Sequence, residues 1–194
     1  MRAILTILTA VMLMAPATVQ ISSSDPYGVD PVYDKLAEID AANRILPLIL
    51  TKDQIGRLLP VIETCRQNVR NQEKKEATQM KGMQEEVDKV HADALKGIVP
   101  SQQFLDKVSK MFVGFENERR GVKTANGLIL RDAIKSTLNE GQRKAMIGVV
   151  DQVFNEQSQE WEDASDEAKI MYYSLSFLMN DDVYYFLVKL RRNL

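Results

Sequence analysis

Apolar residues recur at helical spacing along two long stretches in the middle of the chain. In each stretch they return every three or four residues, and the series keeps its phase across a polar interval. A period near 3.6 residues indicates one apolar face on an α-helix. The pattern therefore predicts a long helix from Lys52 to about Gly97 and a second from about Gln102 to Ser136, with Ser101 at its start. The apolar positions are Ile55, Leu58, Leu59, Ile62, Cys65, Val69, Met80, Met83, Val87, Val90, Ala94 and Leu95, then Phe104, Val108, Met111, Phe112, Phe115, Val122, Ala125, Ile129 and Ala133.

The two polar intervals, residues 70–79 and 116–123, lie at similar distances from a turn near Val99. Folding the helices back on each other would place polar opposite polar, so the sequence predicts an all-α fold built on a long antiparallel helical hairpin. Such a pair is too thin to have a core of its own. Its apolar faces need flanking helices or a second protomer, and we expect a homodimer.

A short motif begins the first long helix and recurs, in altered form, after the second. It reads LTKDQ at residues 50–54 and LNEGQ at residues 138–142. In each copy a Thr or Asn can cap the helix, and the Gln three residues on can reach back to the amide of that cap. The preceding Leu can pack against the first turn. The motif residues are Leu50, Thr51, Gln54, Leu138, Asn139 and Gln142.

Two capping boxes of this form in a small helical chain resemble the LTxxQ motif of the periplasmic Spy/CpxP family, in which the motif occurs twice. The first copy fits the pattern fully, and the second has Asn for Thr. The resemblance covers roughly residues 31–157. It implies a helical hairpin with flanking helices, cradle-shaped homodimers, and a role as a stress-response chaperone or as a signalling accessory that binds the periplasmic domain of a membrane sensor.

The beginning of the chain has the features of a secretory signal peptide. Arg2 precedes a short apolar run, and Ala15-Pro16-Ala17 is a small-residue cleavage site, which predicts a signal peptide over residues 1–17. Residues 18–30 are rich in Ser, Pro and Gly and are expected to be a flexible lead-in. The chain has 25 basic and 27 acidic residues, so its overall charge gives no attraction to nucleic acid. We expect a periplasmic or otherwise secreted product without a transmembrane segment.

The remaining residues, 31–194, are interpreted as a single helical domain, in which 158–194 form a C-terminal extension. A first helix is expected from Pro31 to about Leu46, with Leu36, Ile39 and the Ile45-Leu46 pair on its apolar side. In the extension we expect a cap at Ser165, a helix through Leu178, a break at residues 180–182 and a short last helix. This aromatic-rich part could be an extra layer over the base of the hairpin or an interaction segment, and the first is favoured.

No catalytic constellation is apparent, and the chain is not expected to be an enzyme or to need a cofactor. The sole histidine, His91, and the sole cysteine, Cys65, lie many turns apart on one predicted helix, and there is no glycine-rich phosphate loop. Some relatives of the family bind metals through His, Met, Glu or Cys. Met80 and Met83 share the apolar face with Cys65 and His91, but core methionines and a buried or seam histidine are the favoured interpretation, and no metal site is predicted.

Basic residues cluster on one side of the first long helix and on the facing part of the second. They could form a surface that binds unfolded client proteins, although salt bridges with Glu63 and Glu73 on a solvated face are the simpler account. The candidate residues are Arg66, Arg70, Lys74, Lys81, Arg119, Arg120 and Lys123.

These features favour a secreted, ATP-independent chaperone or envelope-stress accessory protein that binds unfolded or misfolded proteins. A holdase of this kind needs no nucleotide site. The alternatives are a periplasmic metal-binding sensor or resistance protein, and a structural protein that partners a membrane sensor.

Overall fold

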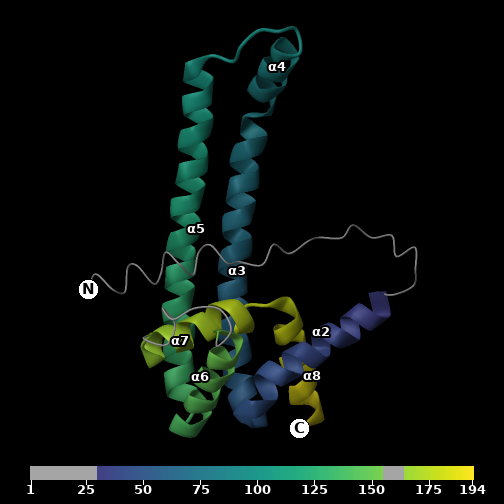
Figure 1. Cartoon of the computed structure of the whole chain (residues 1–194), viewed down its shortest axis with the longest axis vertical. Coiled ribbons are helices and arrows are strands. Elements are labelled where there is room, and N and C mark those ends of the chain that lie inside the picture. Colours follow the sequence, from purple (N-terminus) through teal and green to yellow (C-terminus); the bar gives the residue numbers. More distant parts are fainter. Residues whose placement is uncertain (1–29, 155–163) are drawn as a thin grey trace. The chain divides into compact units, whose positions relative to one another are not determined.

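The computed structural model describes residues 30–154 and 164–194, and its regular elements there are all helical (Figure 1). Within these residues the prediction of an all-α fold is confirmed. The predicted signal peptide, nearly all of the lead-in and residues 155–163 lie outside the described part. None of the described helices is long and apolar enough to cross a membrane.

The chain divides into two compact units. The second unit is Thr64–Asn126, and the first unit comprises Met1–Glu63 and Gly127–Leu194. Helices α3 and α5 each contribute to both. The elements are α2 (Asp30–Ile45), the 3₁₀ turn η2 (Leu46–Leu48), α3 (Lys52–Gly82), α4 (Gln84–Ala94), α5 (Gln102–Thr137), α6 (Glu140–Phe154), α7 (Asp166–Tyr173), the π-helical turn η4 (Ser174–Leu178) and α8 (Asp181–Asn193).

The first unit has an apolar core to which every one of its described helices contributes. The C-terminal helices supply Tyr173, Phe177 and Leu187, so this segment is an integral layer of the core. The predicted cap at Ser165 is present there, and Asn180, in the predicted break, caps the last helix. Ser165 Oγ accepts from Ala168 N at 3.3 Å, and Asn180 Oδ1 accepts from Asp182 N at 2.8 Å. The largest fully buried residues of the core are Ile45, Leu48, Ile55, Leu58, Ile62, Leu130, Ile134, Met146, Val150, Tyr173, Leu178 and Leu187.

Two predicted apolar faces of the first unit are wrong in part. In and directly after α2, the predicted Ile45 is buried, but Leu36, Ile39 and Leu46 are more than half exposed, and Ala41 is buried instead. Only the last turns of α2 meet the core. In the final turns of α5 the buried residues are Leu130 and Ile134, one position after the predicted Ile129 and Ala133. Residues 129 and 130 are both apolar, and so are residues 133 and 134. Hydrophobicity alone therefore does not show which residue of each pair faces the core.

The second unit consists of parts of α3 and α5 together with α4. The single helix predicted to reach Gly97 is wrong, because it ends at Gly82 and resumes as α4. At Met83 the backbone N–H bonds to Met80 O, three residues back, after a glycine that weakens the helix. Helix α4 is followed by Gly97 in the left-handed conformation, and Ile98 N donates to Asp93 O as in a Schellman end. Ser101 Oγ then accepts from Phe104 N, as predicted.

Within the second unit the chain segments pair with opposite direction. From residue 68 to residue 86 on α3 and α4 the bonded partners on α5 shift from residue 126 to residue 107. Two of the bonded pairs, Gln72 with Glu118 and Glu76 with Arg119, join the polar intervals of the two helices. The pairs are Asn68 with Asn126, Gln72 with Glu118, Glu76 with Arg119, and Glu86 with Lys107.

Candidate functional site

Each copy of the repeated motif is a complete capping box in the first unit. Thr51 Oγ1 accepts from Gln54 N at 3.2 Å, and Gln54 Oε1 accepts from Thr51 N at 3.0 Å. In the second copy Asn139 Oδ1 accepts from Gln142 N at 2.9 Å, and Gln142 Oε1 accepts from Asn139 N at 3.1 Å. The substitution of Asn for Thr therefore keeps both bonds of the box.

The two boxes are also joined to each other, which the sequence did not predict. The amides of Gln54 and Gln142 form a reciprocal pair, each Nε2 donating to the other Oε1 at 2.9 Å. The same nitrogens donate to the chain before the opposite helix. Gln54 Nε2 bonds Thr137 O at 3.1 Å, and Gln142 Nε2 bonds Leu48 O at 3.1 Å. The arrangement has a local two-fold character, and we call it the glutamine interlock.

Flanking residues hold the glutamine interlock in place. Leu50 and Leu138, which precede the two caps, are both buried, as expected of apolar residues that pack on the first turn. Ile49 has a positive φ of 47°, although its side chain is 82% exposed. This left-handed turn brings Ile49 O within 3.2 Å of Gln142 Nε2. A β-branched residue rarely adopts that conformation, so the turn is under strain.

The predicted basic client-binding set is not one surface. Arg66 is buried, because it lies beside Cys65 where α3 faces inward, and its assignment to a client-binding surface is wrong. Lys123 is half-buried, and burial lowers the pKa of its ammonium group. Arg70, Lys74, Lys81, Arg119 and Arg120 are exposed. Of these, Arg119 pairs with Glu76 across the helices, and Arg120 pairs with Glu116 one turn away.

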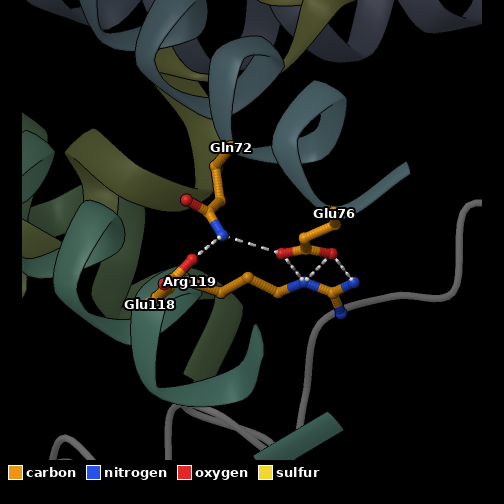
Figure 2. A network of polar contacts seen from close by, with 4 residues as sticks. All are labelled: Gln72, Glu76, Glu118 and Arg119. Atoms are coloured by element: carbon orange, nitrogen blue, oxygen red, sulfur yellow. Dashed lines mark hydrogen bonds and ion pairs between the residues drawn. The ribbon is translucent and has the colours of Figure 1, made fainter. Parts of the chain in front are cut away.

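A polar network crosses the second unit at the middle of α3 and α5 (Figure 2). The side chain of Glu76 is only 4% exposed and accepts from Arg119 Nε at 2.8 Å. Gln72 Nε2 donates to both Glu76 and Glu118. Bonding to Arg119 lowers the pKa of Glu76, against the opposing effect of burial, and bonding to Lys75 lowers the pKa of Glu118. Both carboxylates are therefore kept ionised.

Asn126 is a buried polar residue at a position where the sequence pattern predicted none. Its Nδ2 donates to Cys65 O at 2.9 Å, and its Oδ1 accepts from Asn68 Nδ2 at 2.9 Å. It thereby bonds the interior of α5 to that of α3. The signal was present in the sequence, because Asn126 occupies the position four residues after Val122 and four before Leu130. Burial of the neighbouring Cys65 thiol raises its pKa, which disfavours the reactive thiolate.

A surface hollow of about 330 Å³ lies next to this asparagine, between α3 and α5 of the second unit. We call it the amide hollow. It is lined by Asn68, Asn71, Gln72, Lys75, Val122, Ala125 and Asn126. Four carboxamides and two apolar side chains therefore line the hollow.

The residues singled out for possible metal binding have different environments. Cys65 is buried, whereas His91 and Met80 are exposed, so a buried or seam position for His91 is wrong. Met83 is half-buried. Within the described ranges no group of three His, Cys, Asp or Glu residues is placed to hold a metal ion.

No protein-family model matches the chain, and neither a curated protein nor a solved structure matches it.

Proposed function

We propose that this chain is a secreted, periplasmic, ATP-independent chaperone or envelope-stress accessory protein, related to the Spy/CpxP family, that binds unfolded or misfolded proteins without catalysing a reaction. The doubled capping box is the observation that carries the proposal. The resemblance rests on that motif, and in the glutamine interlock both glutamines have a role that requires two copies. A chance pair of unrelated caps would not need matching glutamines.

Exposed apolar side chains of the second unit are the proposed client contacts. Val99, Leu95 and Ile98 are 84%, 77% and 57% exposed around the turn between α4 and α5. Exposed apolar groups of this kind favour protein interaction. Exposed cations of the same unit, Lys74 and Lys81, would attract acidic clients, and the apolar contacts would then retain them. Further exposed apolar residues of this unit are Met80, Val87, Leu105, Phe112 and Val113.

A light-scattering assay with an aggregating client protein tests the proposal. Stoichiometric amounts of the mature chain should suppress aggregation without ATP. Changing Leu95, Ile98 and Val99 together to Ser should weaken suppression. The matched control changes Val32, Leu36 and Ile39 to Ser, because these α2 side chains are also more than half exposed but lie in the first unit. Equal activity of the two triple variants would contradict the proposed surface.

A parallel calorimetric titration with zinc, nickel and copper(I) separates the chaperone from a metal-binding sensor. If aggregation is unaffected while a metal binds with micromolar affinity or better, the proposed chaperone function is wrong and a metal-sensor function is supported instead.

Homodimer formation is also part of the proposal, as a second protomer could cover part of the exposed apolar surface. Sedimentation at micromolar concentration tests it, and a compact monomer would contradict it.

A further inference from the structure

We propose that the amide hollow binds the main chain of an extended, unfolded polypeptide. This inference rests on the proposed function and deepens it, because it names the chemical group of the client that is recognised. The hollow lies entirely within the second unit, between α3 and α5, and its residues take no part in the apolar surface proposed above.

Hydrogen bonds among the described residues leave complementary groups for a ligand. Asn68 and Gln72 use their amide nitrogens in bonds to Asn126, Glu76 and Glu118, so their oxygens remain as acceptors. In Asn71 the oxygen is already bonded, because it accepts from Gln67 Nε2, and the amide nitrogen remains as a donor. Figure 2 shows the oxygen of Gln72 directed away from the carboxylates that its nitrogen contacts. The walls therefore offer both donors and acceptors.

The charge of the hollow favours a neutral ligand. Lys75 is its one charged wall residue, and Lys75 Nζ lies 2.7 Å from Glu118 Oε1. The ammonium charge is thus compensated, and a phosphate or carboxylate ligand would have to compete with Glu118. A neutral group that both donates and accepts hydrogen bonds meets no such competition.

The polypeptide main chain has this chemistry. Every residue except proline carries one N–H donor and one carbonyl acceptor, whatever its side chain. Val122 and Ala125 also line the hollow and supply apolar surface for Cα–H groups and small side chains. The volume of about 330 Å³ is near the lower end of ligand pockets, which span roughly 300–1,000 Å³, and so suits a few residues of extended chain. Main-chain recognition would let one site accept clients of unrelated sequence.

The test uses calorimetry with a capped, uncharged peptide of Ala, Gly and Ser and with the same peptide N-methylated on its main chain. N-methylation removes the donors and leaves the side chains unchanged. The mature full chain should bind the unmodified peptide about tenfold or more tightly, a difference of about 1.4 kcal/mol. Equal affinity for the two peptides would overturn the inference.

Ala125→Phe should fill the hollow and weaken peptide binding by about tenfold or more. The matched control, Ala77→Phe, adds the same bulk at an exposed position of α3 outside the hollow and should bind as wild type. Circular dichroism checks that both variants fold. If Ala125→Phe does not, Asn71→Ala and its exposed control Asn117→Ala replace the pair, with weaker binding expected only for Asn71→Ala.

The aggregation assay distinguishes failure of this inference from failure of the proposed function. If wild type suppresses aggregation but shows no peptide binding, or if the hollow variants equal their controls, the main-chain site is wrong and the chaperone stands. If wild type neither suppresses aggregation nor binds the peptide, both are wrong.

Discussion

The two units of the described chain bury different kinds of side chain. The first unit buries large aliphatic and aromatic groups throughout, whereas the buried apolar residues of the second unit are Cys65 and Phe115. Arg66, Glu76 and Asn126 are buried there as well. Buried polar groups contribute little net stability when they are hydrogen-bonded. Any other arrangement of the helices that leaves these groups buried without hydrogen bonds is destabilised. Apolar burial therefore stabilises the first unit, while polar contacts specify how the helices of the second unit pair.

The second unit has exposed apolar side chains that are available for binding. A unit that pairs its helices through polar groups can leave many of its apolar side chains exposed without losing its structure. Met80, Phe112 and Val99 are examples, each between 46% and 84% exposed. Segments with few buried apolar contacts open more readily than a packed core. The second unit is therefore expected to open more readily than the first.

The largest expected effect tests the apolar core of the first unit. Ile134 is fully buried, so Ile134→Ala should lower the free energy of unfolding by about 2–5 kcal/mol. The control is Ile129→Ala on the same helix, where the side chain is 41% exposed and a much smaller loss is expected. Denaturant titration measures both. Equal losses would mean that burial does not distinguish these positions.

Much of the fold was predictable because its signals are local. Periodicity predicted the helices, and the caps at Thr51, Ser101 and Ser165 were recognised from residue type and spacing. The predicted phase of α5 is wrong because Ile129 and Leu130 are both apolar, and only packing in the folded core decides between them. Local sequence also gave no reason for α2 to leave Leu36 exposed.

The candidate sites were less predictable because they depend on contacts distant in sequence. Both capping boxes were recognised, but the bonds between Gln54 and Gln142 join residues whose approach depends on the whole first unit. Likewise, charge spacing on α3 alone could not show that Arg66 is buried or that Glu76 would pair with Arg119. The amide hollow has no sequence signature, since it requires side chains from two antiparallel helices.

The next largest effect concerns the glutamine interlock. Gln54→Glu keeps the capping box, because Glu can accept the bond from the cap amide as Gln does. The substitution removes the amide nitrogen that donates to Thr137 O and to Gln142 Oε1. Two acceptors would then face each other, and we expect a loss of about 2 kcal/mol near neutral pH. Thr51→Ala is the control for the cap alone and should lose about 1 kcal/mol.

A double-mutant cycle separates the interlock from its boxes. Gln54→Ala and Gln142→Ala should be non-additive by at least about 0.5 kcal/mol, because each removes the same reciprocal bonds. Additive losses would show that the two boxes act as independent caps and that the bonds between them contribute no coupling.

A smaller and more local effect is expected in the polar network of the second unit. Arg119→Ala removes the main partner of buried Glu76 and should reduce hydrogen-exchange protection in this unit by about 1.5 kcal/mol at neutral pH. Arg120→Ala is the control, because its pair with Glu116 is solvent-exposed, and little change is expected. Loss of protection in the first unit instead would contradict the division between the units.

The pH dependence of this network has a defined sign. The pKa of Glu76 is lowered on folding below its ordinary value of 4.5, so the ionised form is favoured in the folded state. Its contribution is fully present above that value and is lost as the pH falls through the lowered folded pKa. Protection of the second unit should therefore decrease on acidification below about pH 4.5 in wild type, and less so in Arg119→Ala. An identical acid response in both proteins would exclude Glu76 as its source.

The smallest effect tests whether the first unit stores strain at the glutamine interlock. Ile49 adopts a left-handed backbone conformation with its side chain exposed, so packing does not compensate the strain. Ile49→Asn should raise the free energy of unfolding by about 0.5–1 kcal/mol, because Asn tolerates this conformation. Leu46→Asn, at a half-exposed position with ordinary φ, should give no gain. If the bond from Gln142 to Ile49 O holds the strained turn, the gain should shrink in a Gln142→Ala background, where the backbone can relax. A gain of the same size in both backgrounds would mean that the turn is fixed by the chain on either side of it, and that the interlock only makes use of a conformation already present.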